Sequence, residues 1–165
     1  MTITATRCLI LACGNTLRGD DRLGPWLAQW AEERFQADQD VRILSCQQWT
    51  PELAEDIAQA ESVLFIDASV DSLPGSVNLI PVHPASSTQS LATHHLGAEE
   101  LLALSRDLYS AAPASAVLLT VGAASTELGA DFSEPVIAAL PRAFALLEKT
   151  VLGLLANHKE RSHRT

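Results

Sequence analysis

The sequence predicts an α/β protein made of a single domain, a three-layer sandwich with a five-stranded, mostly parallel sheet and helices on both faces. Short apolar runs alternate along the chain with segments whose apolar residues recur every three or four positions. With 165 residues, of which 47% are hydrophobic, the chain is long enough to bury one core. We place the domain at residues 1–157 and a polar, frayed tail at 158–165.

Five segments are predicted to be strands, because each is a short apolar run bounded by polar or turn-forming residues. They are residues 7–13, 41–46, 62–69, 75–82 and 115–123. The short link between the third and fourth segments is typical of a hairpin, so we expect one antiparallel strand in an otherwise parallel sheet.

Helices are predicted to follow most of the strands. They are the segment from Leu23 to Phe35, residues 50–60, residues 96–109 and the region after Ser133. Thr50 and Ser133 are expected to cap their helices, and Pro141 is expected to end the last helix or to open a second, long amphipathic one. The polar stretch 83–95 has no periodicity and is expected to be a loop.

Charge and composition narrow the classes of function. The formal net charge of −9 argues against a nucleic-acid partner, which needs a basic surface to neutralise phosphates. The sequence contains no apolar run near the roughly 20 residues of a membrane span, and no signal peptide is expected. Three cysteines without a Cys-x-x-Cys pair fit a reduced, cytoplasmic protein.

The turn after the first strand, GNTLRGDD, carries the most specific pattern. Ligands of open α/β sheets bind at the carboxyl ends of the strands, and Gly14 and Gly19 have the spacing of a phosphate-binding loop. Asp20 and Asp21 stand where that loop would have lysine and a hydroxyl residue, so the turn favours a cation or proton transfer. Capping of the following helix would account for one of the two aspartates.

Two further positions complete a candidate site. Asp67 ends the third strand, which lies beside the first strand if the sheet is doubly wound, although a simple turn role is also possible. His94 and His95 precede a helix at the end of the polar loop. Two carboxylates and an imidazole are suitable ligands for a divalent transition metal.

Cys46 is a competing candidate, as the nucleophile of a thiol hydrolase. Nothing in its local sequence indicates a lowered thiol pKa, and a buried structural cysteine is the more frequent case. Trp49 lies near the end of the second strand and is expected to line a peptide groove.

Together, GNTLRGDDRLG after the first strand, FIDAS at the end of the third and HHLG before a later helix resemble the hydrogenase maturation proteases. These endopeptidases remove the C-terminal tail of a [NiFe]-hydrogenase large subunit after nickel insertion. The resemblance covers most of the chain and implies a five-stranded twisted sheet between helices. It departs from the family in two places: Asp21 replaces the glutamate of some members, and SCQQWTPEL replaces their acidic, glycine-rich turn after the second strand.

The resemblance implies that Asp21, Asp67 and His94 are both the catalytic and the metal-contacting residues. Asp21 is preferred to Asp20, and His94 to His95, because they keep the family's spacing. The implied metal is nickel carried by the substrate, a large-subunit precursor, and the free enzyme is expected to hold no metal of its own. Two alternatives stay open: a hydrolase with its own bound ion, and a non-catalytic, nickel-sensing chaperone of the large subunit.

Overall fold

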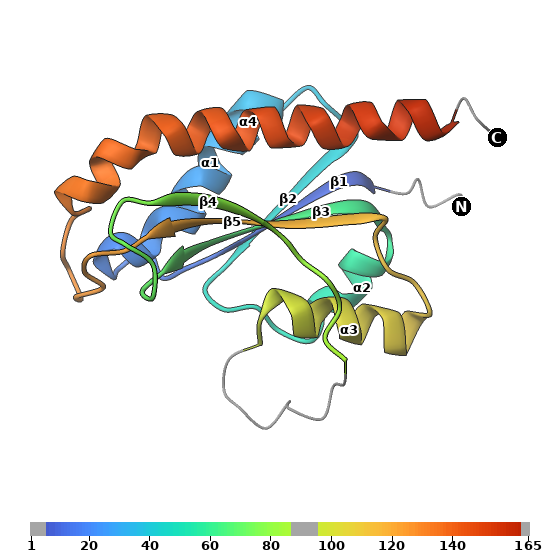
Figure 1. Cartoon of the computed structure of the whole chain (residues 1–165), viewed down its shortest axis with the longest axis horizontal. Coiled ribbons are helices and arrows are strands. Elements are labelled where there is room, and N and C mark those ends of the chain that lie inside the picture. Colours follow the sequence, from blue (N-terminus) through green and yellow to red (C-terminus); the bar gives the residue numbers. More distant parts are fainter. Residues whose placement is uncertain (1–5, 87–95, 163–165) are drawn as a thin grey trace.

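The computed structural model describes residues 6–86 and 96–162, and the side chains only as far as residue 157. A five-stranded sheet forms its centre (Figure 1). The strands are β1 (Thr6–Cys13), β2 (Val41–Cys46), β3 (Ala60–Ser69), β4 (Val77–Pro81) and β5 (Ser115–Gly122). Their order in the sheet is β2-β1-β3-β5-β4, and only β4 runs antiparallel to its neighbour. The predicted α/β class and the five mostly parallel strands are confirmed.

Helices cover both faces of the sheet, as predicted. They are the short 3₁₀ helix η1 (Gly19–Arg22) and the α-helices α1 (Leu23–Phe35), α2 (Leu53–Ala58), α3 (Ala98–Tyr109) and α4 (Glu134–Ser162). Figure 1 shows α1 and α4 on one face and α2 and α3 on the other. The molecule is therefore a three-layer sandwich.

The central strands are apolar on both faces because each face is buried under helices. In β1, Ile10 and Ala12 belong to the core beneath α1 and α4, while Leu9 and Leu11 belong to the core beneath α2 and α3. Alternate side chains of a strand point to opposite faces, so a single unbroken apolar run supplies both cores.

The order of the strands decides where a ligand can bind. After β1 the chain moves to β2 on one side, and β3 then pairs with the other side of β1. Loops that leave β1 and β3 therefore diverge at a topological switch point, where open sheets form crevices at the carboxyl ends of their strands. The expected adjacency of the first and third strands is confirmed.

The predicted hairpin between the third and fourth strands is wrong. β4 pairs with β5, which lies between β3 and β4. The reason is burial: β3 carries a fully buried run from Val63 to Ile66 and has parallel neighbours on both edges, whereas in β4 Leu79 and Ile80 are 38% and 48% exposed. β4 ends at Pro81, and a half-exposed strand with proline suits the edge of a sheet.

The prediction for Pro141 is also wrong, because α4 continues through it. Proline in a helix removes one backbone hydrogen bond and crowds the preceding turn. Buried side chains nevertheless recur at steps of three and four on both sides of it, at Val136, Ala139, Ala143, Leu147 and Val151. The burial of this continuous apolar face stabilises the helix by more than the missing hydrogen bond costs. Figure 1 shows that the first turns of α4 are inclined to the rest of the helix.

Two further boundaries differ from the expectations. α2 begins at Leu53 without a side-chain cap, so the proposed cap at Thr50 is wrong, and residues 50–52 form a turn before the helix. The backbone of α4 is helical as far as Ser162. The division of the chain at residue 157 stays a prediction. Within the described ranges, no helix is long and apolar enough to cross a membrane.

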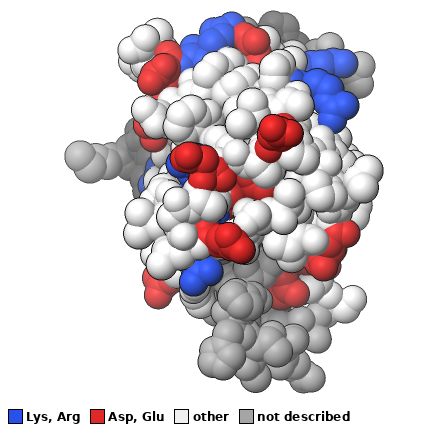
Figure 2. Space-filling model, turned by 90° about the vertical axis from the view of Figure 1, so that its left-hand side faces the viewer, with Lys and Arg blue, Asp and Glu red and all other residues white. Residues whose placement is uncertain are grey.

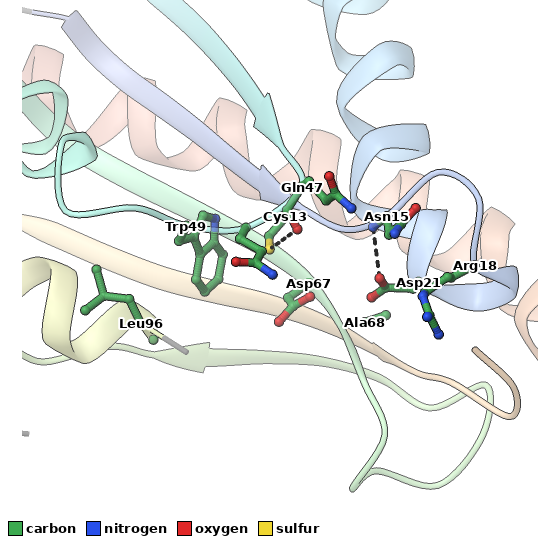
Figure 3. A pocket seen from close by; sticks show the side chains of 11 residues that line it. Cys13, Asn15, Arg18, Asp21, Gln47, Trp49, Asp67, Ala68 and Leu96 are labelled. Carbon is green, nitrogen blue, oxygen red and sulfur yellow. Dashed lines mark hydrogen bonds between the residues drawn. The ribbon is translucent and has the colours of Figure 1, made fainter. Parts of the chain in front are cut away.

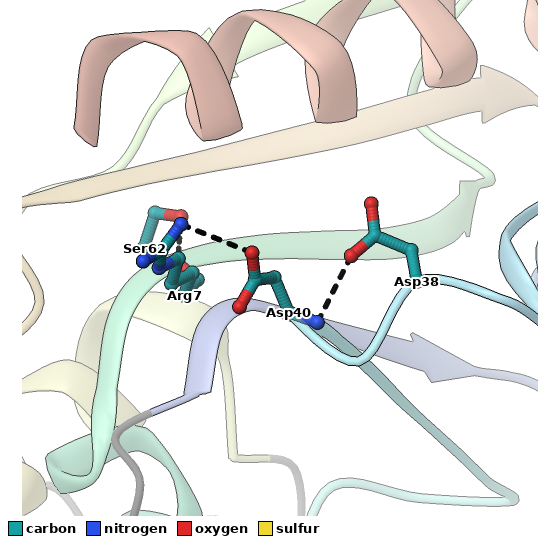
Figure 4. Close-up of polar contacts among 4 residues, drawn as sticks. All are labelled: Arg7, Asp38, Asp40 and Ser62. Atoms are coloured by element: carbon teal, nitrogen blue, oxygen red, sulfur yellow. Dashed lines mark hydrogen bonds and ion pairs between the residues drawn. The ribbon is translucent and has the colours of Figure 1, made fainter. Parts of the chain in front are cut away.

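Polar contacts hold the amino ends of the strands together (Figure 4). Arg7 in β1 forms an ion pair with Asp40 at 3.0 Å, and Asp38 accepts the backbone N–H of Asp40 at 2.9 Å. The hydroxyl of Ser62 in β3 donates to the backbone carbonyl of Arg7 at 2.7 Å. These contacts hold β1 in place at its amino end. The carboxyl ends of the strands, where ligands of open sheets bind, lie at the opposite end of the sheet.

Candidate functional site

A pocket opens at the carboxyl ends of β1, β2 and β3, at the switch point of the sheet (Figure 3). The turn after β1, the turn after β2, the end of β3 and the start of the α3 region each contribute side chains. The lining residues are Cys13, Asn15, Arg18, Asp21, Gln47, Gln48, Trp49, Asp67, Ala68, Leu96 and Gly97. The structure therefore brings two of the predicted site residues, Asp21 and Asp67, into one pocket.

Asp21 is positioned by the tight turn that follows β1. Its Oδ2 accepts the backbone N–H of Asn15 at 2.9 Å. The turn packs so closely that a Cβ on Gly14 would lie 1.9 Å from the backbone oxygen of Asp21, and Gly14 has a φ of +153°. Only glycine fits there, which explains why a glycine turn accompanies the carboxylate.

Asp67 enters the pocket from the end of β3. Burial raises the pKa of its carboxyl group, and the nearby charge of Asp21 raises it further, to about 7; a backbone hydrogen bond at Ala68 acts weakly in the opposite direction. A carboxyl group with a pKa near neutrality can accept or donate a proton at physiological pH, which is the property that general acid–base catalysis requires.

Asp20 has a structural role. Its side chain is fully buried and accepts hydrogen bonds from the backbone N–H groups of Ala124, Ser125 and Ser133 and from the Ser133 hydroxyl, at 2.7–3.1 Å. Burial would raise the pKa of Asp20, but the donors of Ser133, Ser125 and Ala124 outweigh it and lower the pKa. Asp20 thus ties the turn after β1 to the segment between β5 and α4.

Asp21 lines the pocket, whereas the carboxylate of Asp20 bonds to the segment between β5 and α4. The role of Asp21 as a catalytic and metal-contacting residue stays a prediction. Neither aspartate caps a helix, because η1 and α1 have Arg18 and Arg22 at their N-cap positions and no side-chain cap. The capping alternative is wrong. Ser133, expected as a cap, instead directs its hydroxyl to Asp20.

His94 and His95 lie outside the described residues. The pocket is bordered by Leu96 and Gly97, which follow them directly in the chain. Among the described residues, no group of three or more histidine, cysteine, aspartate or glutamate side chains is arranged to hold a metal. The expected ligand set of Asp21, Asp67 and His94 stays a prediction.

The cysteines at this edge do not have the properties of nucleophiles. Cys13 and Cys46 lie side by side at the ends of β1 and β2 without forming a disulfide. Burial raises the pKa of both thiols, and for Cys13 the charge of Asp67 adds to the effect and brings the pKa to about 12. Neutral thiols are poor nucleophiles, which argues against the thiol hydrolase.

Trp49 lines the pocket, as expected, and packs edge-on against Phe65 with ring centroids 5.3 Å apart. Sequence reasoning missed Asn15, whose backbone positions Asp21 and whose Oδ1 accepts the N–H of Leu17 at 2.9 Å. Asparagine after glycine in a turn is the signal that could have indicated it, since short polar side chains bond to the backbone two residues on.

The surface around the pocket is acidic. Figure 2 shows the end of the molecule at which β1, β3 and β5 finish, and acidic side chains gather on this face. This charge favours the approach of cations and basic segments and disfavours phosphates.

Comparisons with known proteins identify the fold. No protein-family model matches the chain. HybD from E. coli, a hydrogenase maturating endopeptidase, superposes with a TM-score of 0.70 at 22% identity, over 89% of this chain and 93% of HybD. HycI from Thermococcus kodakarensis KOD1, a [NiFe] hydrogenase maturation protease, superposes with a TM-score of 0.64 at 26% identity, over 92% of this chain and 93% of HycI.

A relative found by sequence agrees with the structural matches. The hydrogenase expression/formation protein HupM from Azotobacter chroococcum mcd 1 is 28% identical over 151 residues, which cover 88% of this chain and 72% of HupM. The chain is similar to the hydrogenase maturation proteases, as its motifs predict. HycI and a second [NiFe] hydrogenase maturation protease from Thermococcus kodakarensis, HybD, are 26% and 25% identical to the chain, and with them the peptidase class expected from the resemblance is confirmed.

Proposed function

We propose that the chain is an endopeptidase that removes the C-terminal extension of a [NiFe]-hydrogenase large-subunit precursor after nickel insertion. The observation that carries this proposal is the pair of carboxylates, Asp21 and Asp67, in one pocket at the switch point of a maturation-protease fold. The substrate supplies the nickel, and the protease reads the metal as the sign that assembly is complete.

The carboxylates have complementary properties for this task. Asp21 is held by the N–H of Asn15 and supplies a fixed oxygen ligand or charge at the pocket wall. Asp67, with its pKa raised to about 7 by burial and by Asp21, can transfer a proton. His94, next to the pocket in the chain, would add an imidazole, the commonest protein ligand of transition metals.

Two routes to hydrolysis are compatible with these residues. In the first, nickel bound to the substrate polarises the scissile carbonyl or activates a water, and the carboxylates hold the metal centre in place. In the second, an aspartic-type route, Asp67 takes a proton from the attacking water and nickel serves as a recognition signal only. Both routes need Asp21 and Asp67 in the same pocket. In both, the protease meets its precursor in the cytoplasm.

The test is a cleavage assay on a purified large-subunit precursor, with and without nickel, read by intact mass. We expect the nickel-loaded precursor alone to lose its tail. Asp21→Asn and Asp67→Asn should slow the cleavage at least ~100-fold, the usual scale for removing a group that transfers protons. Asp71→Asn is the matched control, because Asp71 is exposed in the loop after β3, outside the pocket lining.

The alternatives predict other outcomes. Cleavage that does not depend on nickel would favour a hydrolase of another substrate. Full tail processing by Asp67→Asn in cells would favour a chaperone that docks on the large subunit. Parallel His94→Ala and His95→Ala variants decide which histidine belongs to the site, because only one of them should lose activity.

A further inference from the structure

One charged side chain of the pocket has no part in the proposed chemistry. Arg18 lies in the turn after β1, three residues before Asp21, and is the only arginine or lysine among the described residues that line the pocket (Figure 3). Its side chain is exposed at the entrance, where a bound peptide would pass.

Arg18 differs from most other arginines in the described part of the chain, because it has no carboxylate partner there. Five arginines form ion pairs, namely Arg7, Arg22, Arg34, Arg42 and Arg106. The guanidinium of Arg18 makes one contact, at 3.5 Å, with the backbone oxygen of Thr126. This contact is longer, and therefore weaker, than a charge-assisted hydrogen bond to a carboxylate. Because a guanidinium has five N–H donors and this contact uses one, most of the donors of Arg18 are available.

The backbone of Arg18 is nevertheless held firmly. Its N–H donates to the carbonyl of Asn15 at 3.1 Å, and its own carbonyl accepts the N–H of Asp21 at 2.9 Å. Arg18 also forms an isolated antiparallel bridge with Leu128, in the segment after β5. An exposed guanidinium on an anchored backbone can bind a ligand at the entrance without a large loss of backbone entropy.

We infer that Arg18 binds a carboxylate of the precursor next to the bond that is cut, and so contributes to the choice of client. This inference rests on the proposed function. A planar guanidinium with free donors matches a carboxylate in two parallel hydrogen bonds, and it repels metal ions. Among the described residues that line the pocket, Arg18 alone carries a positive charge that attracts an anionic group, on a face that is otherwise rich in acidic side chains.

The carboxylate has two possible sources, an acidic side chain near the cleavage site and the free C-terminus of the tail. They are distinguished by two sets of precursor variants. The first set replaces each aspartate or glutamate near the cut bond by its amide, one at a time. The second set lengthens the tail by a few glycine and serine residues, which moves the terminal carboxylate away and leaves the side chains in place.

The experiment measures kcat and KM for each nickel-loaded precursor with wild-type enzyme, Arg18→Gln and Arg18→Lys. Arg142→Gln is the control, since Arg142 is also exposed but binds the backbone oxygen of Gly75 outside the pocket lining. We expect Arg18→Gln to raise KM about tenfold, the scale of one hydrogen bond to a charged group, with kcat little changed. Arg18→Lys should recover part of the loss.

The decisive outcome is non-additivity. One precursor variant should lose about tenfold in kcat/KM with the wild-type enzyme and nothing further with Arg18→Gln, as two partners of one interaction do. The inference is overturned if all precursor variants lose the same factor with both enzymes, or if Arg18→Gln cleaves the parent precursor as the wild type does. If the wild-type enzyme cleaves no precursor, the proposed function fails instead.

Discussion

Replacing Asp67 by asparagine should abolish cleavage and yet stabilise the metal-free protein at neutral and alkaline pH. The carboxyl group of Asp67 is partly buried beside Asp21, and both burial and that charge disfavour its ionised form, raising its pKa from 3.8 to about 7. Asparagine has nearly the same shape and carries no charge. The substitution therefore removes the unfavourable charge while it keeps the packing.

The size and sign of the effect follow from linkage. Because the folded pKa lies above the unfolded one, the folded state holds more protons than the unfolded chain between about pH 4 and pH 7, and wild-type stability falls as the pH rises through this window. A shift of roughly three pKa units corresponds to at most ~4 kcal/mol. Asp67 is partly exposed and water reaches the pocket, so we expect about 2 kcal/mol above pH 7.

The assay is urea unfolding of wild type and Asp67→Asn at several pH values from 4 to 8, with a chelator present so that no divalent ion neutralises the pocket. The difference in the free energy of unfolding should be small near pH 4 and grow in favour of the variant up to about pH 7. Asp71→Asn, at an exposed position of the next loop, should show no such growth.

A second variant tests the cause. The comparison is repeated between Asp21→Asn and the double variant Asp21→Asn/Asp67→Asn. Their difference in the free energy of unfolding should stop growing at a lower pH, because the charge of Asp21 is the second contribution to the raised pKa of Asp67. The reasoning is refuted if the wild type and Asp67→Asn differ by a constant amount from pH 4 to 8, or if the variant is the less stable protein at pH 8.

Three other changes have defined outcomes. Asp20→Asn should destabilise the fold by ~3 kcal/mol in urea unfolding, because the amide turns a donor towards one of the buried N–H or O–H groups that the carboxylate accepts; an unchanged midpoint would contradict this. Pro141→Ala should raise the free energy of unfolding by about 1–3 kcal/mol by restoring a helical hydrogen bond, and a loss of stability would show that α4 needs the inclination at this point. Cys46→Ala should retain cleavage, and the native thiol should react slowly with iodoacetamide at pH 7, because burial raises its pKa; loss of activity would revive the thiol mechanism.

The sequence by itself determined the class of fold and most of the candidate site. Short unbroken apolar runs between turn-forming residues predict the central strands of a layered sheet, and apolar residues at steps of three and four predict the helices that cover it. The glycine turn with its aspartates and the aspartate that ends the third strand follow from local rules on turns and strand ends. These rules indicate Asp20, Asp21 and Asp67 as candidates, and the resemblance to the maturation proteases prefers Asp21 to Asp20.

The tertiary structure decided what depends on partners distant in the chain. Local pattern cannot tell that β5 lies between β3 and β4, because strand order is set by which edges are buried. Nor can it tell that Asp20 binds residues 104 to 113 positions away while Asp21 faces the pocket. Pro141 shows the same limit: a local preference against helix loses to the buried face that α4 lays on the sheet, since long-range packing outweighs a single hydrogen bond.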